Sequence, residues 1–563
     1  MKKLLSKYGP WLLTLAFGLA VFLFWRFRYP FALTYQEQLQ FFLFDGDYFR
    51  SRMAEPGGPA RYVAEFLVQF YNGVVLGATV IAVLMMLLQR LTWRLMRAEG
   101  HYALSFIPAV MLWYAMGDES IMLTYVVALV MALAAALAWR KWSASWGQWI
   151  KWCALLLFIP LMYWLTGPMV LLVAVLMMPW TLAGAAVVYA VALILLSAHY
   201  LPFPLMRVVL GISYYRFPVT LPYLLVVIPV VVWGLAVGRR VMARPKQWVS
   251  IAEVIVLVIL VPLVDLGYDK RKYDLMEYDY LVRVKDWNSL IAKAEKHSPD
   301  LPMSVSATNL ALAMTNRLGE RAFDFYQRGS EGLLPGFERN FATAQLTGEI
   351  YFHLGLVNTA QRFAFEAMEA IPNYNKSARA VKRLAETNLI NGQYKVARKY
   401  LRMLEKTIFY RPWAKRTLAL LGNEEAINAH PLYGTLRRYR LQEDFLFSEQ
   451  EIDKVCGQLF MHNHQNQMAA QYLLMMPLLD RDVPRFMSYV KVVQNRIQYN
   501  PRAVQEGIAF AFMQQQQLPP QGIVSQWVQQ QLNDFSRVYS QNRNSSELER
   551  FKNTVWYYLT VGK

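Results

Sequence analysis

The chain has 563 residues, of which 56% are hydrophobic and 17% are charged, and its formal net charge is +19. The first half contains several apolar runs of the roughly 20 residues that cross a bilayer, whereas no such run occurs from residue 269 onward. This distribution excludes a chain that is embedded throughout. The basic residues of the first half cluster at the ends of apolar runs. Membrane orientation therefore explains them better than nucleic-acid binding does, and we expect no nucleic-acid partner.

The first apolar run covers residues 11–27 and is predicted to be an uncleaved membrane helix, because no small-residue cleavage site follows it. Lys2, Lys3 and Lys7 favour a cytoplasmic N-terminus. The next stretch, residues 28–66, then emerges on the outer side. It is dense in acids, amides and aromatic residues, which predicts an acidic first outer loop with chemistry at the membrane surface.

Apolar runs predict about nine membrane helices within residues 1–267. The stretch 168–200 would form one helix about 50 Å long, too long for a hydrocarbon core of about 30 Å. We therefore predict a break at Pro179-Trp180, giving either two crossings or a re-entrant pair. The nine candidates are 11–27, 67–90, 102–117, 121–139, 150–166, 168–178, 181–199, 221–238 and 248–267.

Nine crossings place residues 268–563 outside, as the periplasmic domain of a multi-pass bacterial inner-membrane protein. The basic residues weigh on both sides of this prediction. Arg207, Arg216 and residues 270–272 would lie outside, and a single crossing at 168–200 would reverse the side of the second half. Helix length favours nine crossings. The charges then assigned to the cytoplasm are Arg90, Arg94, Arg97, Arg140, Lys141, Arg239, Arg240, Arg244 and Lys246.

The second half is predicted to be entirely helical, so the expected fold class is all-α with two domains, residues 1–267 and 268–563. Leu318-Gly319, Leu354-Gly355 and Asn391-Gly392 recur about 36 residues apart, near the turns of a helix-turn-helix pattern. Over about 300–410 this pattern resembles the tetratricopeptide repeat family, with Tyr394 and Ala397 as the closest match. The resemblance implies a surface that binds peptide or protein.

Residues of two segments fit the transfer of a sugar from a lipid-phosphate donor. Such transfer needs a carboxylate to deprotonate or orient the acceptor and cations to hold the departing phosphate. The first outer loop supplies candidate catalytic acids, and a second outer segment supplies arginines, which match phosphate oxygens, beside aromatic residues. The acids are Glu37, Asp45, Asp47 and Glu65, and the phosphate-binding candidates are Arg28, His199, Arg207, Tyr214, Tyr215 and Arg216.

An essential acid in a first outer loop, followed by further helices and a C-terminal outer domain, resembles the GT-C class of polytopic glycosyltransferases. Asp45-Gly46-Asp47 and Glu37 are the nearest matches to the catalytic acid of that class. The paired adjacent acids of some members and the Trp-Trp-Asp motif of oligosaccharyltransferases are absent. The chain also resembles an uncharacterised family of polytopic Bacteroidota membrane proteins, through residues 35–38, 56–58 and 65–67.

Each candidate residue also has a structural interpretation. Asp45 and Asp47 beside Gly46 suit a turn. Glu37 suits an amphipathic interfacial helix, and Glu65 suits the first turn of the second membrane helix. Arg207 and Arg216 suit lipid anchoring, and His199 an interfacial position.

The resulting functional prediction is a membrane glycosyltransferase. It would pass sugar or oligosaccharide from a polyprenyl-phosphate carrier to a periplasmic acceptor glycan or protein; with a protein acceptor it would be an oligosaccharyltransferase. The alternative is a non-catalytic membrane scaffold whose repeats recruit envelope proteins. The sequence identifies no certain cofactor and leaves a divalent cation open. No metal site is predicted, since His462-Asn463-His464 has no third ligand at metal spacing.

Overall fold

The computed structural model describes residues 2–96, 101–177, 180–216, 222–238, 247–336, 340–372, 376–442, 451–493, 496, 500–543 and 545–562. Helices account for the regular structure of these residues. They contain no strand, only two isolated bridges, one of which joins Ile121 to Tyr215. The predicted all-α fold class is confirmed. Pro179, Arg97 and residues 239–246 lie outside the described residues.

The chain forms two compact units. Unit 1 comprises Met1–Asp274 together with two short later segments, Ile371–Ala378 and Glu405–Arg411. Unit 2 comprises Leu275–Ala370, Arg379–Leu404 and Pro412–Lys563. The domain boundary after residue 267 stays a prediction.

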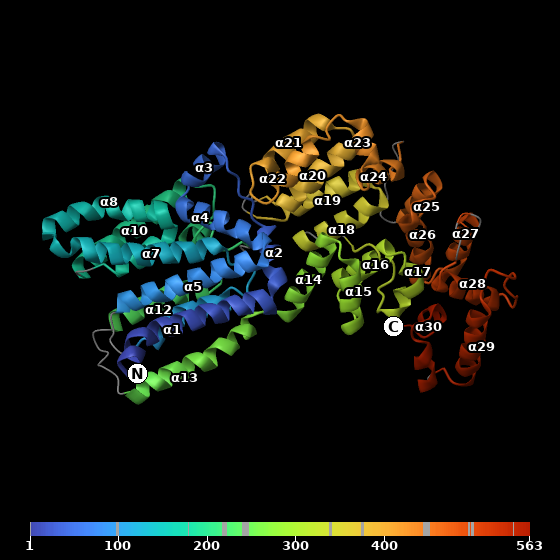
Figure 1. The fold of residues 1–563 in the computed structure, drawn as a ribbon, viewed down its shortest axis with the longest axis horizontal. Coiled ribbons are helices and arrows are strands. Elements are labelled where there is room, and N and C mark those ends of the chain that lie inside the picture. The colour runs from blue at the N-terminus through green and yellow to red at the C-terminus, as the bar shows by residue number, and fades with distance from the viewer. Residues whose placement is uncertain are drawn as a thin grey trace. The chain divides into compact units, whose positions relative to one another are not determined.

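Unit 1 is built from long apolar helices and a helical first loop. Helices α7, α8 and α10 lie side by side (Figure 1). Its helices are α1 (Lys2–Leu23), α2 (Pro30–Glu37), α3 (Gly46–Met53), α4 (Gly58–Val68), α5 (Val74–Met96), α6 (Ile107–Ala115), α7 (Leu123–Trp142), α8 (Gln148–Thr166), α9 (Val170–Val175), α10 (Trp180–Tyr200), α11 (Leu205–Leu210), α12 (Leu224–Gly238) and α13 (Gln247–Leu263).

Six helical stretches of the described residues are long and apolar enough to cross a membrane, and two shorter apolar stretches accompany them. The short ones are Ala103–Ala115 and Leu224–Gly238. The composition of the long and short stretches together is compatible with a membrane protein, whereas the number of crossings stays a prediction. The six long stretches are Tyr8–Arg28, Val74–Met96, Leu123–Ser145, Gln148–Val175, Trp180–Tyr200 and Trp248–Gly267.

Polar contacts mark the two ends of the helical bundle in unit 1. At one end, where α1 leads into the first loop, Arg28 Nη2 pairs with Asp265 at 3.0 Å. At the other end, His101 Nδ1 lies 2.5 Å from Glu253 Oε1 of α13. Helix α13 and the 3-10 turn that follows it, Val264–Gly267, therefore connect the two contacts.

The segment around α9 explains how residues 168–200 are accommodated. Helix α8 ends at Gly167, whose φ of +61° is left-handed and suits glycine. The Met169 amide donates to the Tyr214 hydroxyl at 3.4 Å, while Leu176 accepts from Arg140, near the C-terminus of α7, at 3.5 Å. Since Tyr214 bonds Met122 at the other end of α7, residues 169–176 run antiparallel to α8 before α10 begins.

Unit 2 consists of shorter helices that pack in antiparallel pairs, such as α18 with α19 and α26 with α27. Its helices are α14 (Lys270–Val284, whose first residues belong to unit 1), α15 (Trp287–Lys296), α16 (Pro302–Met314), α17 (Leu318–Arg321), α18 (Phe341–Leu354), α19 (Val357–Glu369), α20 (Ala378–Ile390), α21 (Tyr394–Glu405), α22 (Arg411–Leu418), α23 (Glu424–Ala429), α24 (Tyr433–Tyr439), α25 (Ile452–His462), α26 (Gln467–Leu479), α27 (Val483–Val493), α28 (Arg502–Gln514), α29 (Gln526–Gln541) and α30 (Val555–Thr560).

The same turn ends six of these helices. One residue adopts a left-handed conformation, and the amide that follows it bonds a carbonyl five residues back, as Leu356 does to Tyr351 at 2.9 Å. This is the Schellman arrangement, which satisfies carbonyls at a helix end. The six left-handed residues are Lys285, Asn316, Gly355, Gly392, Arg481 and Gln516.

Two of the three glycines that suggested a repeat occupy this position, and the third does not. At the first turn the left-handed residue is Asn316, whereas Gly319 lies inside α17. A Cβ on Gly319 would lie 2.6 Å from Pro501 Cβ, so glycine is needed there for close packing.

A buried ion-pair network joins α14, α18 and α20 within unit 2. Arg379 Nη1 bonds Asp279 at 2.7 Å, and Arg383 Nη2 bonds Glu349 at 2.6 Å. Burial alone would raise the pKa of Glu349, but Arg383 and Arg379 outweigh it and lower that pKa to about 2. For His353, burial is the main cause that lowers the pKa to about 3, so the imidazole is neutral in the folded chain.

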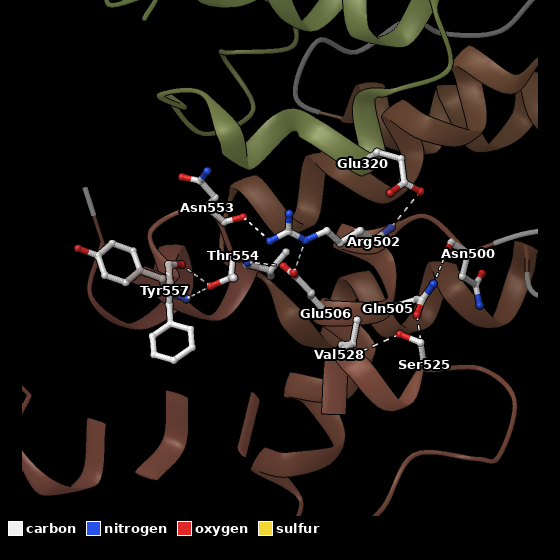
Figure 2. A network of polar contacts seen from close by, with 12 residues as sticks. Glu320, Asn500, Arg502, Gln505, Glu506, Ser525, Val528, Asn553, Thr554 and Tyr557 are labelled. Atoms are coloured by element: carbon white, nitrogen blue, oxygen red, sulfur yellow. Dashed lines mark hydrogen bonds and ion pairs between the residues drawn. The ribbon is translucent and has the colours of Figure 1, made fainter. Parts of the chain in front are cut away.

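A second network closes the C-terminal part (Figure 2). Arg502 Nε donates to Glu506 at 2.7 Å, and Arg502 Nη2 donates to the Asn553 carbonyl at 3.1 Å. The Val555 amide, at the start of α30, donates to Glu506 at 2.8 Å, and the Arg502 amide donates to Glu320 at 3.3 Å. Helix α28 is thereby joined to α17 and α30.

The left-handed turns predict opposite effects for two substitutions. Gly392→Ala should destabilise the α20–α21 turn by about 1 kcal/mol from the left-handed strain alone, since its Cβ would meet open space. Gln516→Gly should stabilise its own turn by roughly 0.5–1 kcal/mol. Hydrogen exchange of the α20 and α28 amides measures both. Equal exchange in Gly392→Ala and wild type would contradict the assignment.

Neutral burial of His353 predicts that unit 2 loses stability as pH falls from about 6.5, where the unfolded imidazole starts to bind a proton that the folded one excludes. Between pH 7 and pH 5 the loss should reach about 2 kcal/mol. His353→Gln should remove this pH dependence, as read from hydrogen exchange of α18, and the exposed His297→Gln should retain it. A flat wild-type profile would be incompatible with a neutral His353.

Candidate functional site

The first loop folds into α2, α3 and α4, and Glu65 of α4 is the centre of its charged cluster. The carboxylate is 1% exposed. Arg61 Nε and Arg52 Nε bond it at 2.9 and 2.8 Å, and the Tyr48 hydroxyl donates to it. Burial would raise the pKa of Glu65, but the charges of Arg61 and Arg52 outweigh burial and hold that pKa below its ordinary value. Glu65 is therefore an ionised, fully bonded group that fixes the loop.

This placement corrects the interpretation of Glu65 as a first-turn charge of the second membrane helix. Glu65 lies near the C-terminus of α4, and the membrane helix α5 begins only at Val74 after a short 3-10 turn. The two arginines, not a helix dipole, provide its stabilisation.

The two acids beside Gly46 lie at the surface of the first loop. Asp45 occupies the N-cap position of α3 without capping it, and its side chain accepts from Lys406 Nζ at 2.7 Å. That hydrogen bond is the main cause that lowers the pKa of Asp45. Asp47 pairs with Arg50 at 2.7 Å, and its side chain is 84% exposed. Asp47 is thus an exposed ion-pair partner, and Asp45 is a half-buried one.

Glu37 ends α2 and differs from those two acids in its burial, since it is only 4% exposed. Its Oε2 accepts from the Tyr410 hydroxyl at 3.3 Å, within unit 1. Glu37 also follows Gln36 and precedes Gln38, both buried amides. Helix α2 therefore presents a buried acid in a polar surrounding.

Arg207 and Arg216 flank a short turn that pairs with the loop before α7. The Arg216 amide donates to the Ser120 carbonyl at 2.6 Å, and Arg216 Nη1 donates to the Glu119 carbonyl at 3.0 Å. Arg207 Nη2 donates to the carbonyl of Tyr215 and, at 3.3 Å, to that of Arg216. The two guanidinium groups are 5% and 2% exposed as residues, so the fold buries both cations.

Neither arginine has a carboxylate partner among the residues that the structure describes. The Glu119 carboxylate instead pairs with Lys272 at 3.1 Å. Within the described part of the chain, Arg207 Nη1 and Arg216 Nε are buried and have no hydrogen-bond acceptor. Burial lowers the pKa of Arg216 to about 10 and also lowers that of Arg207, yet both remain cations near neutral pH. No carboxylate among the described residues bonds either guanidinium, although Glu119 and Asp118 lie near enough to Arg216 to raise its pKa.

The arginines lie close to the first loop. Tyr35 of α2 is near enough to Arg216 to raise its pKa, and Arg61 of α4 is near enough to Arg207 to lower its pKa. The structure therefore brings α2, α4 and the 205–216 segment together within unit 1. Ser120, whose hydroxyl is also buried without a partner, belongs to the same place.

The remaining phosphate-binding candidates separate into three kinds. Tyr214 donates to the Thr166 carbonyl, and the Tyr215 ring lies 4.0 Å from the Arg207 guanidinium carbon, so both support the arginines. Arg28 has its own counter-ion in Asp265. His199 is exposed at the end of α10, where its ring contacts Tyr200.

An apolar cavity of about 480 Å³ begins beside this turn. Val209 and Leu210, two and three residues after Arg207, line it together with Tyr214 and Tyr125. The Tyr125 hydroxyl is occupied by the Leu225 carbonyl at 3.0 Å, so the cavity wall offers ring surface. Its other walls come from the 3-10 turn Gly167–Met169, from α9 and from α12, namely Pro168, Met169, Leu171, Leu172, Val175, Leu225, Val226, Pro229, Val230 and Trp233. Within the described part of the chain, no group of three histidine, cysteine or acidic residues is arranged to hold a metal ion.

Fold and site together define an all-helical protein with an apolar unit, a unit of helical hairpins, and two buried arginines beside an apolar cavity. The chain belongs to the Family of unknown function (DUF6057), whose match covers residues 6–562. No curated protein and no solved structure matches the chain.

Sequence reasoning named Glu65 but missed the residues that hold it in the first loop, namely Arg61, Arg52 and Tyr48. Arg61 and Glu65 stand four residues apart on one helix, a spacing that favours an ion pair and was a usable signal. Arg52 and Tyr48 reach Glu65 from α3 only after the chain turns back. The Ser120 carbonyl accepts from the Arg216 amide, which lies nearly a hundred residues later in the chain, and no local sequence pattern predicts that contact.

The charged cluster predicts that Glu65→Gln destabilises unit 1 by about 3–5 kcal/mol, because Arg52 loses its counter-ion and Arg61 keeps only Glu55, at 2.9 Å. Asp47→Asn, in the same loop but exposed, should change stability by no more than about 0.5 kcal/mol. Thermal unfolding of the purified protein in detergent compares the two. Equal melting temperatures for both variants would refute a stabilising role for Glu65.

Proposed function

We propose that this protein is a polytopic inner-membrane glycosyltransferase of the GT-C type that uses a polyprenyl-phosphate-linked donor. One observation carries the proposal: Arg207 and Arg216 are buried beside an apolar cavity, and no carboxylate of the residues that the structure describes bonds either of them. A lipid phosphate supplies what both features lack, namely negative charge for the guanidinium groups and an apolar chain for the cavity.

The energetic argument starts from the cost of the buried cations. An ion taken out of water without a counter-ion costs several kcal/mol even after the protein relaxes. A bound phosphate would offset this cost, and guanidinium groups match phosphate oxygens through paired N–H donors. Arg207 Nη1 and Arg216 Nε are the donors left open for it.

Membrane insertion of unit 1 is part of the proposal. The apolar stretches of the first half expose large side chains such as Leu157 and Val188 on their outer surfaces, which suits lipid rather than water. With about nine crossings, the first loop and the 205–216 segment would face the periplasm. The donor lipid would then enter the cavity from the bilayer, with its phosphate at the arginines.

Glu37 is the best candidate for the catalytic acid. Glu65 has its oxygens engaged by Arg61, Arg52 and Tyr48, so it is poorly suited to accept a proton. Glu37 is buried on α2 near Tyr35, which itself lies close to Arg216. In the proposed step, Glu37 accepts the proton of the acceptor nucleophile, the nucleophile bonds to the sugar, and the lipid phosphate departs with the bonding electrons of the old linkage.

The helical hairpins of unit 2 favour a binding role for that unit. Consecutive helix pairs such as α18–α19 and α20–α21 support the proposal of a TPR-like array, and arrays of that kind commonly bind peptides or proteins. Unit 2 would present a periplasmic acceptor to the membrane site. The same observation supports the alternative, a non-catalytic scaffold whose hairpins recruit envelope proteins.

The proposal predicts that wild-type protein co-purifies with a polyprenyl-phosphate lipid and that Arg216→Lys lowers its occupancy by at least about tenfold, since a paired charge-assisted contact is lost. Native mass spectrometry measures the bound lipid. Arg50→Ala, which removes an exposed arginine of the first loop, should retain it. If Arg216→Lys and Arg207→Ala both retain as much lipid as wild type, the phosphate site is refuted.

Glu37→Gln separates binding from transfer. The amide cannot accept the proton, so this variant should hold the lipid at wild-type occupancy while losing release of the free lipid phosphate. Asp47→Asn serves as the matched control. If Glu37→Gln turns over like wild type, the catalytic assignment fails while the binding site stands, and the scaffold gains weight.

A further inference from the structure

Helix α21 has a uniformly basic exposed face. Its buried side is formed by Ala397, Leu401 and Leu404. The opposite side carries four exposed cations at helical spacing, which we call the α21 stripe, namely Lys395, Arg398, Lys399 and Arg402. Exposed cations continue on α22, the next helix in the chain (Figure 1).

The α21 stripe is not balanced by neighbouring acids. Among the described residues, no hydrogen bond or ion pair involves any of its four side chains, and Glu405 is the only acid in α21. Elsewhere, exposed cations such as Arg50 and Lys454 are paired with acids on the same helix. Like charges four residues apart, as in Lys395 with Lys399, destabilise a helix. The stripe therefore opposes local stability.

The segment that follows the stripe belongs to unit 1. Glu405–Arg411 joins α21 to α22, and the carbonyl of Lys406 accepts from the Phe44 amide at 2.8 Å. Phe409 packs on Phe70 with ring centroids 6.0 Å apart. Phe70 lies only four residues before Val74, where the apolar helix α5 begins. The stripe is thus connected, by a few residues of chain, to the rim of an apolar helix.

We propose that the α21 stripe binds the headgroups of anionic phospholipids at the outer surface of the membrane. This inference rests on the membrane insertion of unit 1, not on the proposed transfer reaction. Clusters of four or more lysines and arginines next to a membrane helix attract anionic lipids, and each residue strengthens the association about fivefold. The short chain segment that leads from the stripe to Phe409, which packs on Phe70 just before α5, favours a lipid surface over a soluble anionic polymer.

The test uses the full chain in nanodiscs of phosphatidylcholine with increasing phosphatidylglycerol. A fluorophore is placed at the exposed Gln393→Cys in a Cys153→Ser background, and spin-labelled headgroups quench it where the stripe meets the bilayer. Quenching should rise with phosphatidylglycerol and fall with added salt. Arg398→Gln should raise the half-saturating phosphatidylglycerol fraction about fivefold.

A matched variant controls for net charge. It replaces four exposed cations elsewhere in unit 2 by glutamine, namely Lys296, Lys491, Arg550 and Lys552. This variant should be quenched like wild type, whereas the corresponding change of the whole α21 stripe should abolish the response. Three results would overturn the proposal: quenching independent of phosphatidylglycerol, equal loss in both variants, or binding of dextran sulfate with no effect of lipid. Polyprenyl-phosphate that is retained in the stripe variant would show that the donor site and the α21 stripe are independent of each other.

Discussion

The cost of burying a charge without its counter-ion is the constraint on which unit 1 depends. Around Glu65 the constraint is met internally, because Arg61 and Arg52 neutralise the carboxylate and Tyr48 takes a further lone pair. This cluster holds α3 against α4 and so shapes the first loop. The Arg207 guanidinium is buried as well, but no carboxylate among the described residues pairs with it. Within unit 1, the Glu65 carboxylate therefore stabilises the fold, whereas the Arg207 guanidinium is available to bind a ligand.

The backbone explains why Arg207 and Arg216 stay buried even without a bound anion. Each guanidinium donates hydrogen bonds to carbonyl oxygens. Arg207 bonds those of Tyr215 and Arg216, and Arg216 bonds that of Glu119. Dipoles of this kind partly solvate a cation, and they fix its position more rigidly than a mobile acid would. A ligand would then bind to cations that are already oriented, so little ordering of side chains opposes its association.

The sequence could predict the elements whose signal is local. Hydropathy placed the apolar helices, and the break within 168–200 followed from helix length alone. Turn positions were predicted only where glycine holds the left-handed residue, as at Gly355 and Gly392. Asn316 adopts the left-handed conformation at the first turn, and the sequence did not predict it because no glycine is there. Gly319 was wrongly assigned to that turn, since its role is close packing. The burial of Arg207 depends on contacts between distant segments, which residue types do not reveal.

The two cationic regions of the chain differ in hydration, and this difference determines what each can recognise. The α21 stripe is in water, so its attraction to anions is long-ranged, non-selective and weakened by salt. Arg207 and Arg216 are already dehydrated by the fold, so a ligand that reaches them meets short, directional bonds that salt screens little. A surface of the first kind suits a fluid layer of many headgroups. A site of the second kind suits a single phosphate whose exact position matters, as it must for a group that departs from a reacting centre.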